Sequence, residues 1–226
     1  MSTGPARAAL LLLADGRLPA GAYAHSAGLE PAVHDGHVRD LDDVESFARG
    51  RLETAGLVAA TFAAAACHAV AAGDSSRLAS LDEGLDARMP SPTARATSRQ
   101  LGRQLVRVVA RMRQDARLGW LPRAPHQPLA LGTACAVFDL EPRDAALAVL
   151  HDTVSGVFAA AVRLLSLDPL ASHERLARCA QRVDEVAGEA DRGAGDDVAD
   201  LPACAAPLLD LLAEHHGART GRLFAS

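Results

Sequence analysis

The chain has 226 residues, of which 49% are hydrophobic and only 3% aromatic, and its formal net charge is −5 at pH 7. Alanine and leucine, which favour helices, supply most of the apolar residues, whereas the β-branched and aromatic residues typical of strands are sparse. The sequence therefore predicts an all-α fold, and its negative charge argues against a protein that binds nucleic acid or a membrane surface.

Helical patterns follow one another through the first half of the chain. We expect a short helix over residues 6–14, a structured turn up to residue 28, and helices over residues 40–55 and 58–72. Residues 58–72 are apolar on nearly all sides, as in a buried central helix, and the nearly uncharged run around residues 57–72 is too short to span a bilayer comfortably. Asp40 and Asp43 resemble a capping box, Gly73 suits a helix end, and Asp74 suits the start of the next helix.

Proline marks the helix starts in the second half. Ser91-Pro92 precedes a long predicted helix that ends near residue 118, and Pro128 follows a Pro-rich connection and suits the first turn of another helix. Glu141-Pro142 and Asp168-Pro169 begin helices that reach about residues 167 and 187. Residues 188–200 are acidic and Gly-rich, which predicts a mobile loop, and a last helix follows over residues 201–216. We expect a single domain over residues 1–226, a bundle of roughly eight to ten helices.

The cysteines point to a reducing compartment. Cys67, Cys135, Cys179 and Cys204 are widely spaced within apolar helical patterns, which fits neither a disulfide framework nor a C-x-x-C metal site. We expect buried, reduced thiols. Because the N-terminus also lacks a convincing signal peptide, the sequence predicts a cytoplasmic protein.

No pattern in the sequence indicates catalysis. There is no nucleophile elbow, no P-loop and no dinucleotide-binding fingerprint. The nine histidines lack the H-E-x-x-H spacing, and the adjacent His215 and His216 would point about 100° apart on a helix. We therefore expect no enzyme, no resident cofactor and no permanent metal site. The alternative that stays open is a helical metal-binding enzyme that uses scattered histidines.

The segment over residues 18–30 is a specified turn. Gly21 and Gly28 allow backbone conformations that a Cβ atom would forbid, and Pro19 fixes the backbone where the turn begins. Ser26 is placed to cap the following helix, and Glu30 lies near the helix start, where the helix dipole favours a carboxylate. The alternative is an ordinary turn between two helices.

The extended tail, residues 217–226, places an apolar pair beside a cation. Arg222-Leu223-Phe224 either packs on its own domain or inserts into a partner, because an exposed phenylalanine gains by burial.

A row of arginines recurs every four residues and forms a slanted ridge along the predicted helix. This ridge is either a solvated face or a docking surface for an acidic protein, and a third alternative is a nucleic-acid-binding surface, which would bind DNA with strong salt dependence. Its members are Arg95, Arg99, Arg103, Arg107 and Arg111.

The ordered set of motifs resembles the urease accessory protein UreF family over nearly the whole chain. The matching stretches are Leu18-Pro19, Gly21, Tyr23, Ser26 and Gly28-Leu29-Glu30; His126 with Gly132; residues 159–164 before Asp168-Pro169; and His216 followed by residues 222–226.

The resemblance implies an all-helical homodimer that acts in the maturation of nickel urease. UreF-like proteins bind the UreD/UreH scaffold and recruit the GTPase UreG, and the complex inserts nickel into apo-urease with GTP hydrolysis. Such a chain catalyses nothing covalently. The complex handles the nickel and UreG binds the GTP, so the chain itself would need no cofactor.

The same resemblance predicts which residues bind partners, without dividing them between UreD and UreG. It assigns no catalytic, cofactor-binding or metal-binding residue. The predicted partner-binding residues are His216, Arg222, Leu223, Phe224 and Ser226 at the C-terminal end, with Pro19, Gly21, Tyr23, Ser26, Gly28 and Glu30 shaping an adjoining surface.

Overall fold

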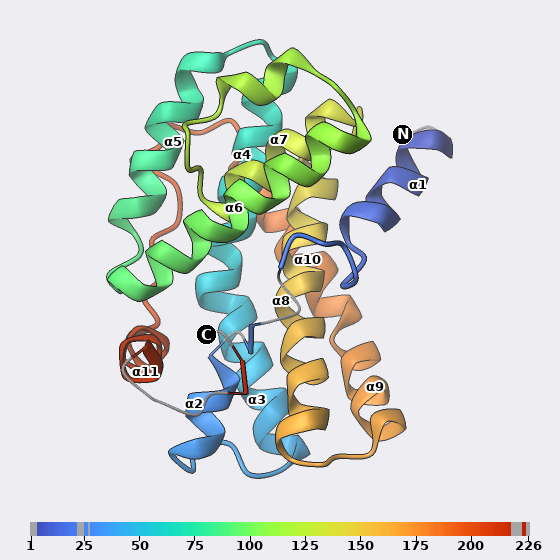
Figure 1. Ribbon diagram of the computed structural model, residues 1–226, viewed down its shortest axis with the longest axis vertical. Helices are drawn as coiled ribbons and strands as arrows, with labels where there is room; N and C mark the ends of the chain where they lie inside the picture. Colours follow the sequence, from blue (N-terminus) through green and yellow to red (C-terminus); the bar gives the residue numbers. More distant parts are fainter. Residues whose placement is uncertain (1–3, 22–24, 27, 218–222, 225–226) are drawn as a thin grey trace.

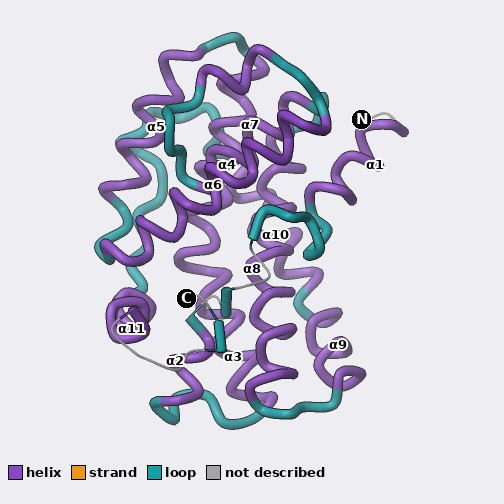
Figure 2. The backbone as a smooth tube through the Cα atoms, in the orientation of Figure 1, coloured by secondary structure: helices purple, strands orange, loops and turns teal. Residues whose placement is uncertain are grey.

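The computed structural model describes residues 4–21, 25–26, 28–217 and 223–224. Within these ranges every regular element is a helix and no strand is present (Figures 1 and 2), which confirms the all-α prediction. The α segments are labelled α1 to α11, and because α3 and α4 are joined without a break, the described chain has ten separate α-helices.

The helices follow in a simple order. The first half contains α1 (Gly4–Leu13), α2 (Leu29–His34), α3 (Leu41–Arg51), a π-helical turn (Leu52–Gly56), α4 (Leu57–Ala71), α5 (Ser75–Ala87) and α6 (Pro92–Met112). The second half contains a 3-10 turn (Ala116–Trp120), α7 (Gln127–Val137), α8 (Pro142–Leu164), α9 (Pro169–Arg178), α10 (Ala180–Arg192) and α11 (Pro207–Gly217).

The central helix α4 is buried on nearly all sides, as its sequence predicts, and packs against α5, α7, α8 and α10 (Figure 1). Its many alanines leave room for neighbouring backbones to come close. Gly132 of α7 uses this room, because a Cβ atom there would collide with the carbonyl oxygen of Ala63. The α4–α7 pair is therefore a close contact between small residues.

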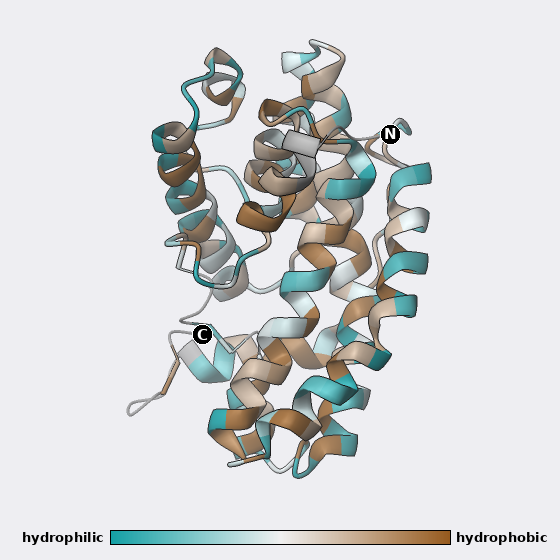
Figure 3. Ribbon diagram, turned by 90° about the vertical axis from the view of Figure 1, so that its right-hand side faces the viewer, coloured by the Kyte–Doolittle hydropathy of each residue, from teal (hydrophilic) through white to brown (hydrophobic). Residues whose placement is uncertain are grey.

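The outer helices cover this centre. Figure 3 shows hydrophilic and hydrophobic residues alternating along them, as expected for helices that turn one face inward. The last helix, α11, packs against α6 and α2. Its Glu214 accepts hydrogen bonds from the Ser91 hydroxyl and from the Thr93 backbone N–H at 2.9 Å, at the start of α6. These bonds fix α11, which precedes the C-terminal tail, beside the start of α6.

Several helix limits differ from the predicted ones. Residues 41–71 form one continuous 31-residue helix rather than two, because the π-helical turn carries the chain past Gly56 without a break. The helix α6 ends at Met112 rather than near residue 118, since Asp115 caps a separate 3-10 turn and pairs with Arg117 at 2.7 Å. The predicted helix after Pro169 divides at Cys179 into α9 and α10.

The loop predicted over residues 188–200 also differs from the observed structure. Its first residues belong to α10, which runs to Arg192, and the last helix starts at Pro207 rather than at residue 201. Arg77 donates to the carbonyl of Ala194 at 3.1 Å, and Arg88 donates to the carbonyls of Val198 and Leu201 at 2.8 and 3.0 Å. Two arginines of α5 and its C-terminal end thus hold a segment that its composition predicted to be mobile.

Two helices are long and apolar enough to cross a membrane by length and composition, the continuous helix Leu41–Ala71 and α8. The apolar run over residues 57–72 that the sequence singles out is shorter than the first of these helices, which extends from it in the N-terminal direction to Leu41. In both helices more than half of the most apolar window, 67% and 56%, is buried inside the fold, which is the behaviour of core helices.

The cysteine prediction is confirmed at three positions and wrong at one. Cys67, Cys135 and Cys179 are buried free thiols, whereas Cys204 is exposed in the loop before α11. Burial raises the pKa of Cys67 to about 12, so this thiol stays protonated at neutral pH.

Candidate functional site

The turn before α2 is built as the sequence predicts. Gly28 has a φ of 86°, in the left-handed region that favours glycine. The Ser26 hydroxyl oxygen accepts the backbone N–H of Glu30 at 3.2 Å, and the Ser26 carbonyl accepts the N–H of Leu29 at 3.0 Å. Gly28 holds the formal cap position, but Ser26 satisfies one of the N–H groups at the helix start, and the capping prediction is confirmed in that sense.

The Glu30 carboxylate binds the tail. Its Oε1 accepts the backbone N–H of Leu223 at 2.7 Å, and its Oε2 accepts the N–H of Phe224 at 3.0 Å. Hydrogen bonds to a charged acceptor are stronger than those between neutral groups. One side chain at the start of α2 therefore holds two consecutive peptide groups of the C-terminal segment, which lies beside α2 (Figure 1).

The two tail side chains have opposite environments. Phe224 is only 4% exposed, and the guanidinium of Arg163, near the end of α8, lies 4.2 Å from its ring centroid. This distance fits a cation–π contact. Leu223 is 64% exposed. The sequence leaves two alternatives for the tail, packing on its own domain or inserting into a partner. Phe224 packs on its own domain, whereas Leu223 faces solvent.

Two histidines complete this cluster. His216 of α11 is buried, with Nε2 at 3.6 Å from Oε2 of Glu30. Burial lowers the pKa of His25, and the neighbouring His216 adds to this effect. We call His25, Ser26, Glu30, His216, Leu223 and Phe224 the tail cluster.

A cavity of about 450 Å³ adjoins the tail cluster. His25, Gly28 and His216 line it, together with Arg51 and Asp152 from α3 and α8. The Nε atom of Arg51 is buried and has no hydrogen-bond partner among the described residues. Burial lowers the pKa of Arg51 and raises the pKa of Asp152. Arg51 and Asp152, which are both partly exposed, thus line the same cavity as the two histidines.

The comparisons with known proteins agree with one another. The family model named UreF matches residues 38–180. The urease accessory protein UreF of Mycobacterium sp. (strain JLS) is 42% identical over 217 residues, covering 96% of this chain and 97% of that protein. The protein of the same name from Mycobacterium marinum (strain ATCC BAA-535 / M) is 40% identical over 219 residues, covering 97% and 98%. The chain belongs to the UreF family.

The family name establishes a urease accessory protein rather than an enzyme, so the alternative of a helical metal-binding enzyme is wrong. The part of this UreF-family chain that matches the family model, residues 38–180, leaves out both the turn before α2 and the tail. Among the described residues, no group of three or more His, Cys, Asp or Glu side chains could hold a metal ion.

The remaining predicted residues of this UreF-family chain are more scattered. Gly21 has a φ of 90° and lies against Gln104 of α6, outside the tail cluster, and Pro19 is exposed. Tyr23, Arg222 and Ser226 lie outside the described residues. The predicted partner-binding role of these positions stays a prediction.

Two residues that carry the resemblance have internal contacts. The ring nitrogens of buried His126 lie 3.1 Å from Ser98 Oγ and 3.1 Å from Asp86 Oδ1, which fixes the Pro-rich connection against α5 and α6. Sequence reasoning missed Arg163, which lies within the family-like stretch over residues 159–164 but gave no sign of a contact with the tail.

Proposed function

We propose that this UreF-family chain acts in urease maturation as a non-enzymatic bridge between the UreD/UreH scaffold and the GTPase UreG. In this proposal the complex binds apo-urease and inserts nickel, and GTP hydrolysis by UreG is coupled to the transfer. Nickel is cargo of the complex, GTP is bound by UreG, and the chain works as a cytoplasmic homodimer without a cofactor of its own.

The observation that carries the proposal is the way Glu30 holds the tail. Its carboxylate fixes the backbone of Leu223 and Phe224, and Phe224 is inserted between this turn and Arg163. Phe224 is 4% exposed and Leu223 is 64% exposed, so the tail that Phe224 anchors presents Leu223 to solvent. A fixed, exposed apolar side chain is a suitable anchor for another protein, because no ordering of the tail is required at the moment of binding.

Co-purification tests this function. UreD and UreG are co-expressed with the wild-type chain, with a chain that lacks residues 221–226, and with the variant Leu223→Ser. Both altered chains are expected to keep the helical circular dichroism of the wild type and to lose UreD or UreG. The matched control is Leu170→Ser, because Leu170 is 81% exposed on α9, outside the tail cluster.

Leu223→Ser is the sharper variant, since the deletion also removes buried Phe224 and could weaken the fold. Nickel bound per urease active site, measured in cells that express the whole maturation system, gives a second readout. If Leu223→Ser retains both partners and yields fully nickel-loaded urease, the tail does not dock to either protein.

A further inference from the structure

The ridge of arginines on α6 divides into two halves. Arg99 pairs with Asp82 at 2.9 Å and with Asp86 at 2.6 Å, and Arg95 donates to the carbonyl of Pro90 at 3.0 Å. These inner arginines connect α6 to α5 and to the segment before α6. Arg103 and Arg107, farther along the helix, are exposed. The side chain of neither arginine makes a hydrogen bond or an ion pair with any residue that the structure describes.

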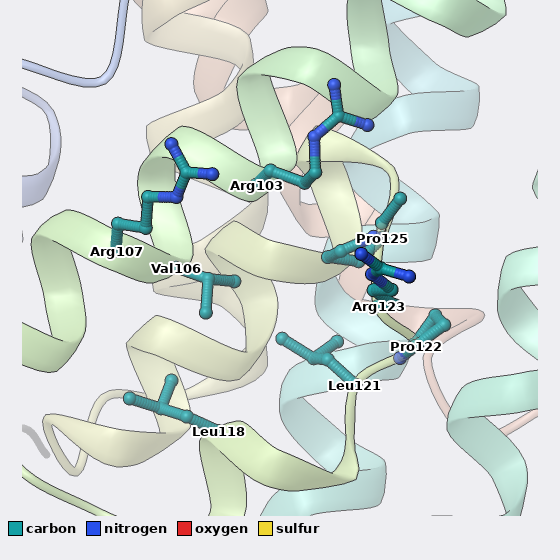
Figure 4. Close-up of a pocket in the computed structure, with 9 residues that line it drawn as sticks. Arg103, Val106, Arg107, Leu118, Leu121, Pro122, Arg123 and Pro125 are labelled. Atoms are coloured by element: carbon teal, nitrogen blue, oxygen red, sulfur yellow. The ribbon is translucent and has the colours of Figure 1, made fainter.

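The outer half borders a pocket of about 600 Å³ between α6 and the segment after the 3-10 turn. Figure 4 shows Val106 of α6 and Leu121 of the opposite segment pointing into this space, with Leu118 at its far end. Pro122, Ala124 and Pro125 complete an apolar lining. The floor of the pocket therefore resembles a site that accepts one apolar side chain of a binding partner.

Three cations line the pocket beside this apolar floor. Arg103 and Arg107 extend from α6, and Arg123 lies on the opposite segment (Figure 4). No carboxylate lines the pocket, although most described arginines elsewhere bind a carboxylate or a backbone carbonyl, as Arg117 does with Asp115. Three like charges close together repel one another, and in a chain of net charge −5 they form a local positive surface.

We propose that this pocket binds an acidic peptide segment of a partner protein, with one apolar side chain inserted between Val106 and Leu121. Carboxylates on either side of that side chain would pair with Arg103, Arg107 and Arg123. Arginine suits this role, because its planar guanidinium binds a carboxylate through two parallel hydrogen bonds.

A nucleic acid fits the pocket less well. A phosphate backbone would meet an apolar floor, and no aromatic side chain lines the pocket to stack on a base. The net negative charge of the chain also repels a polyanion at long range. The pocket shares no lining residue with the tail cluster, so failure of this proposal and failure of the tail proposal can be told apart.

The test uses the full-length chain and a fluorescent peptide, acetyl-Glu-Glu-Leu-Glu-Glu-amide, with binding followed by anisotropy at low salt. We expect saturable binding that weakens as sodium chloride is added. The double variant R103Q/R107Q is expected to bind about tenfold more weakly, because two partly solvated ion pairs are lost. R111Q is the matched control, since Arg111 is exposed on the same helix but does not line the pocket, and its affinity should equal that of the wild type.

Two altered peptides separate the charge from the anchor. Replacing all four glutamates by glutamine should abolish binding, and replacing the leucine by serine should weaken it. A photoreactive leucine at the anchor position should cross-link to residues 118–125 or to Val106. Thermal melting of R103Q/R107Q shows whether the variant is folded.

The proposal is overturned if the wild-type chain does not bind the acidic peptide or if R103Q/R107Q binds it as well as R111Q does. It is also overturned if the cross-link maps elsewhere. A short oligothymidylate that binds these arginines more tightly than the peptide would assign the pocket to nucleic acid instead.

Discussion

The carboxylate of Glu30 accepts the backbone N–H of Phe224 at 3.0 Å, although the two residues are 194 positions apart in the sequence. The same carboxylate accepts the N–H of the preceding residue, Leu223. A single charged side chain in the first turn of α2 thus sets the position of the C-terminal segment. The first two predictions concern this relationship.

Removing the acceptor should release the tail. In Glu30→Ala the N–H groups of Leu223 and Phe224 lose both acceptor oxygens, and each charge-assisted bond contributes about 1–3 kcal/mol. We expect faster carboxypeptidase digestion of the C-terminus, faster hydrogen exchange at Phe224 and a lower melting temperature, because the released tail also gives up the burial of Phe224. Glu83→Ala, at an exposed position on α5, should leave digestion unchanged. A tail as resistant in Glu30→Ala as in the wild type would contradict this structural role.

The two tail side chains should differ in their effect on stability. Phe224→Ala removes a buried ring and is expected to lower the free energy of unfolding by about 2–3 kcal/mol, less than in a deep core because a chain end can rearrange. Leu223→Ala should have almost no effect, since Leu223 is exposed. Arg163→Gln removes the cation over the ring and should cost about 0.5–1 kcal/mol. Urea denaturation measures all three, and equal effects at Leu223 and Phe224 would argue against the observed packing.

Two glycines in helices should respond in opposite ways to the same substitution. A Cβ atom at Gly102 of α6 would collide with the carbonyl oxygen of Pro125, so Gly102→Ala should destabilise the chain by about 2–3 kcal/mol. A Cβ atom at Gly50 of α3 would lie in open space, so Gly50→Ala should stabilise the folded chain by about 0.5–1 kcal/mol. Thermal melting of the two variants provides the comparison. If both substitutions destabilise the chain, the close contact between Gly102 and Pro125 does not explain the effect of Gly102→Ala.

Acid should weaken the cap of the 3-10 turn. The Arg117 guanidinium and backbone N–H lower the pKa of Asp115 from 3.8 to about 2. Because the folded-state pKa is depressed, the stabilisation is fully present above about pH 4 and is lost as the pH falls towards 2. Asp115→Asn should cost about 1–2 kcal/mol at neutral pH, allowing for solvent screening, and little at pH 2. Urea titrations across this range test the difference.

Asp139→Asn is the control for the acid prediction. Asp139 pairs with Arg113 at 3.1 Å, but its side chain is 69% exposed. Its replacement should change stability only slightly at neutral pH. If Asp115→Asn has an equally small effect at neutral pH, the pairing with Arg117 does not stabilise the fold.

The predictable features were those set by neighbouring residues in the chain. Pro92, Pro142 and Pro169 begin helices as predicted, because proline fixes its own φ and needs no N–H in the first turn. Asp74 accepts the N–H of Arg77, and Ser26 accepts that of Glu30, over three and four residues. Helix ends were less predictable. The end of α6 at Met112 was missed, although Asp115, which caps the following 3-10 turn, and Arg117, which pairs with it, lie only two residues apart.

The long-range contacts could not be predicted from local patterns. The four-residue spacing places the ridge arginines along one helix, but which of them face carboxylates depends on where Asp82 and Asp86 of α5 lie. In the same way, the resemblance names Glu30 and Phe224 without indicating that one binds the other. These pairings follow from how the helices pack against one another, and they required the structure.

The contact between Glu30 and Phe224 has a consequence during protein synthesis. Nearly the whole chain is translated between these two residues, so their hydrogen bond can form only once the segment through Phe224 has left the ribosome. A nascent chain can assemble α2 to α8 earlier, but it cannot yet present the tail cluster. Any protein that recognises this cluster would therefore distinguish chains that include Leu223 and Phe224 from shorter nascent chains.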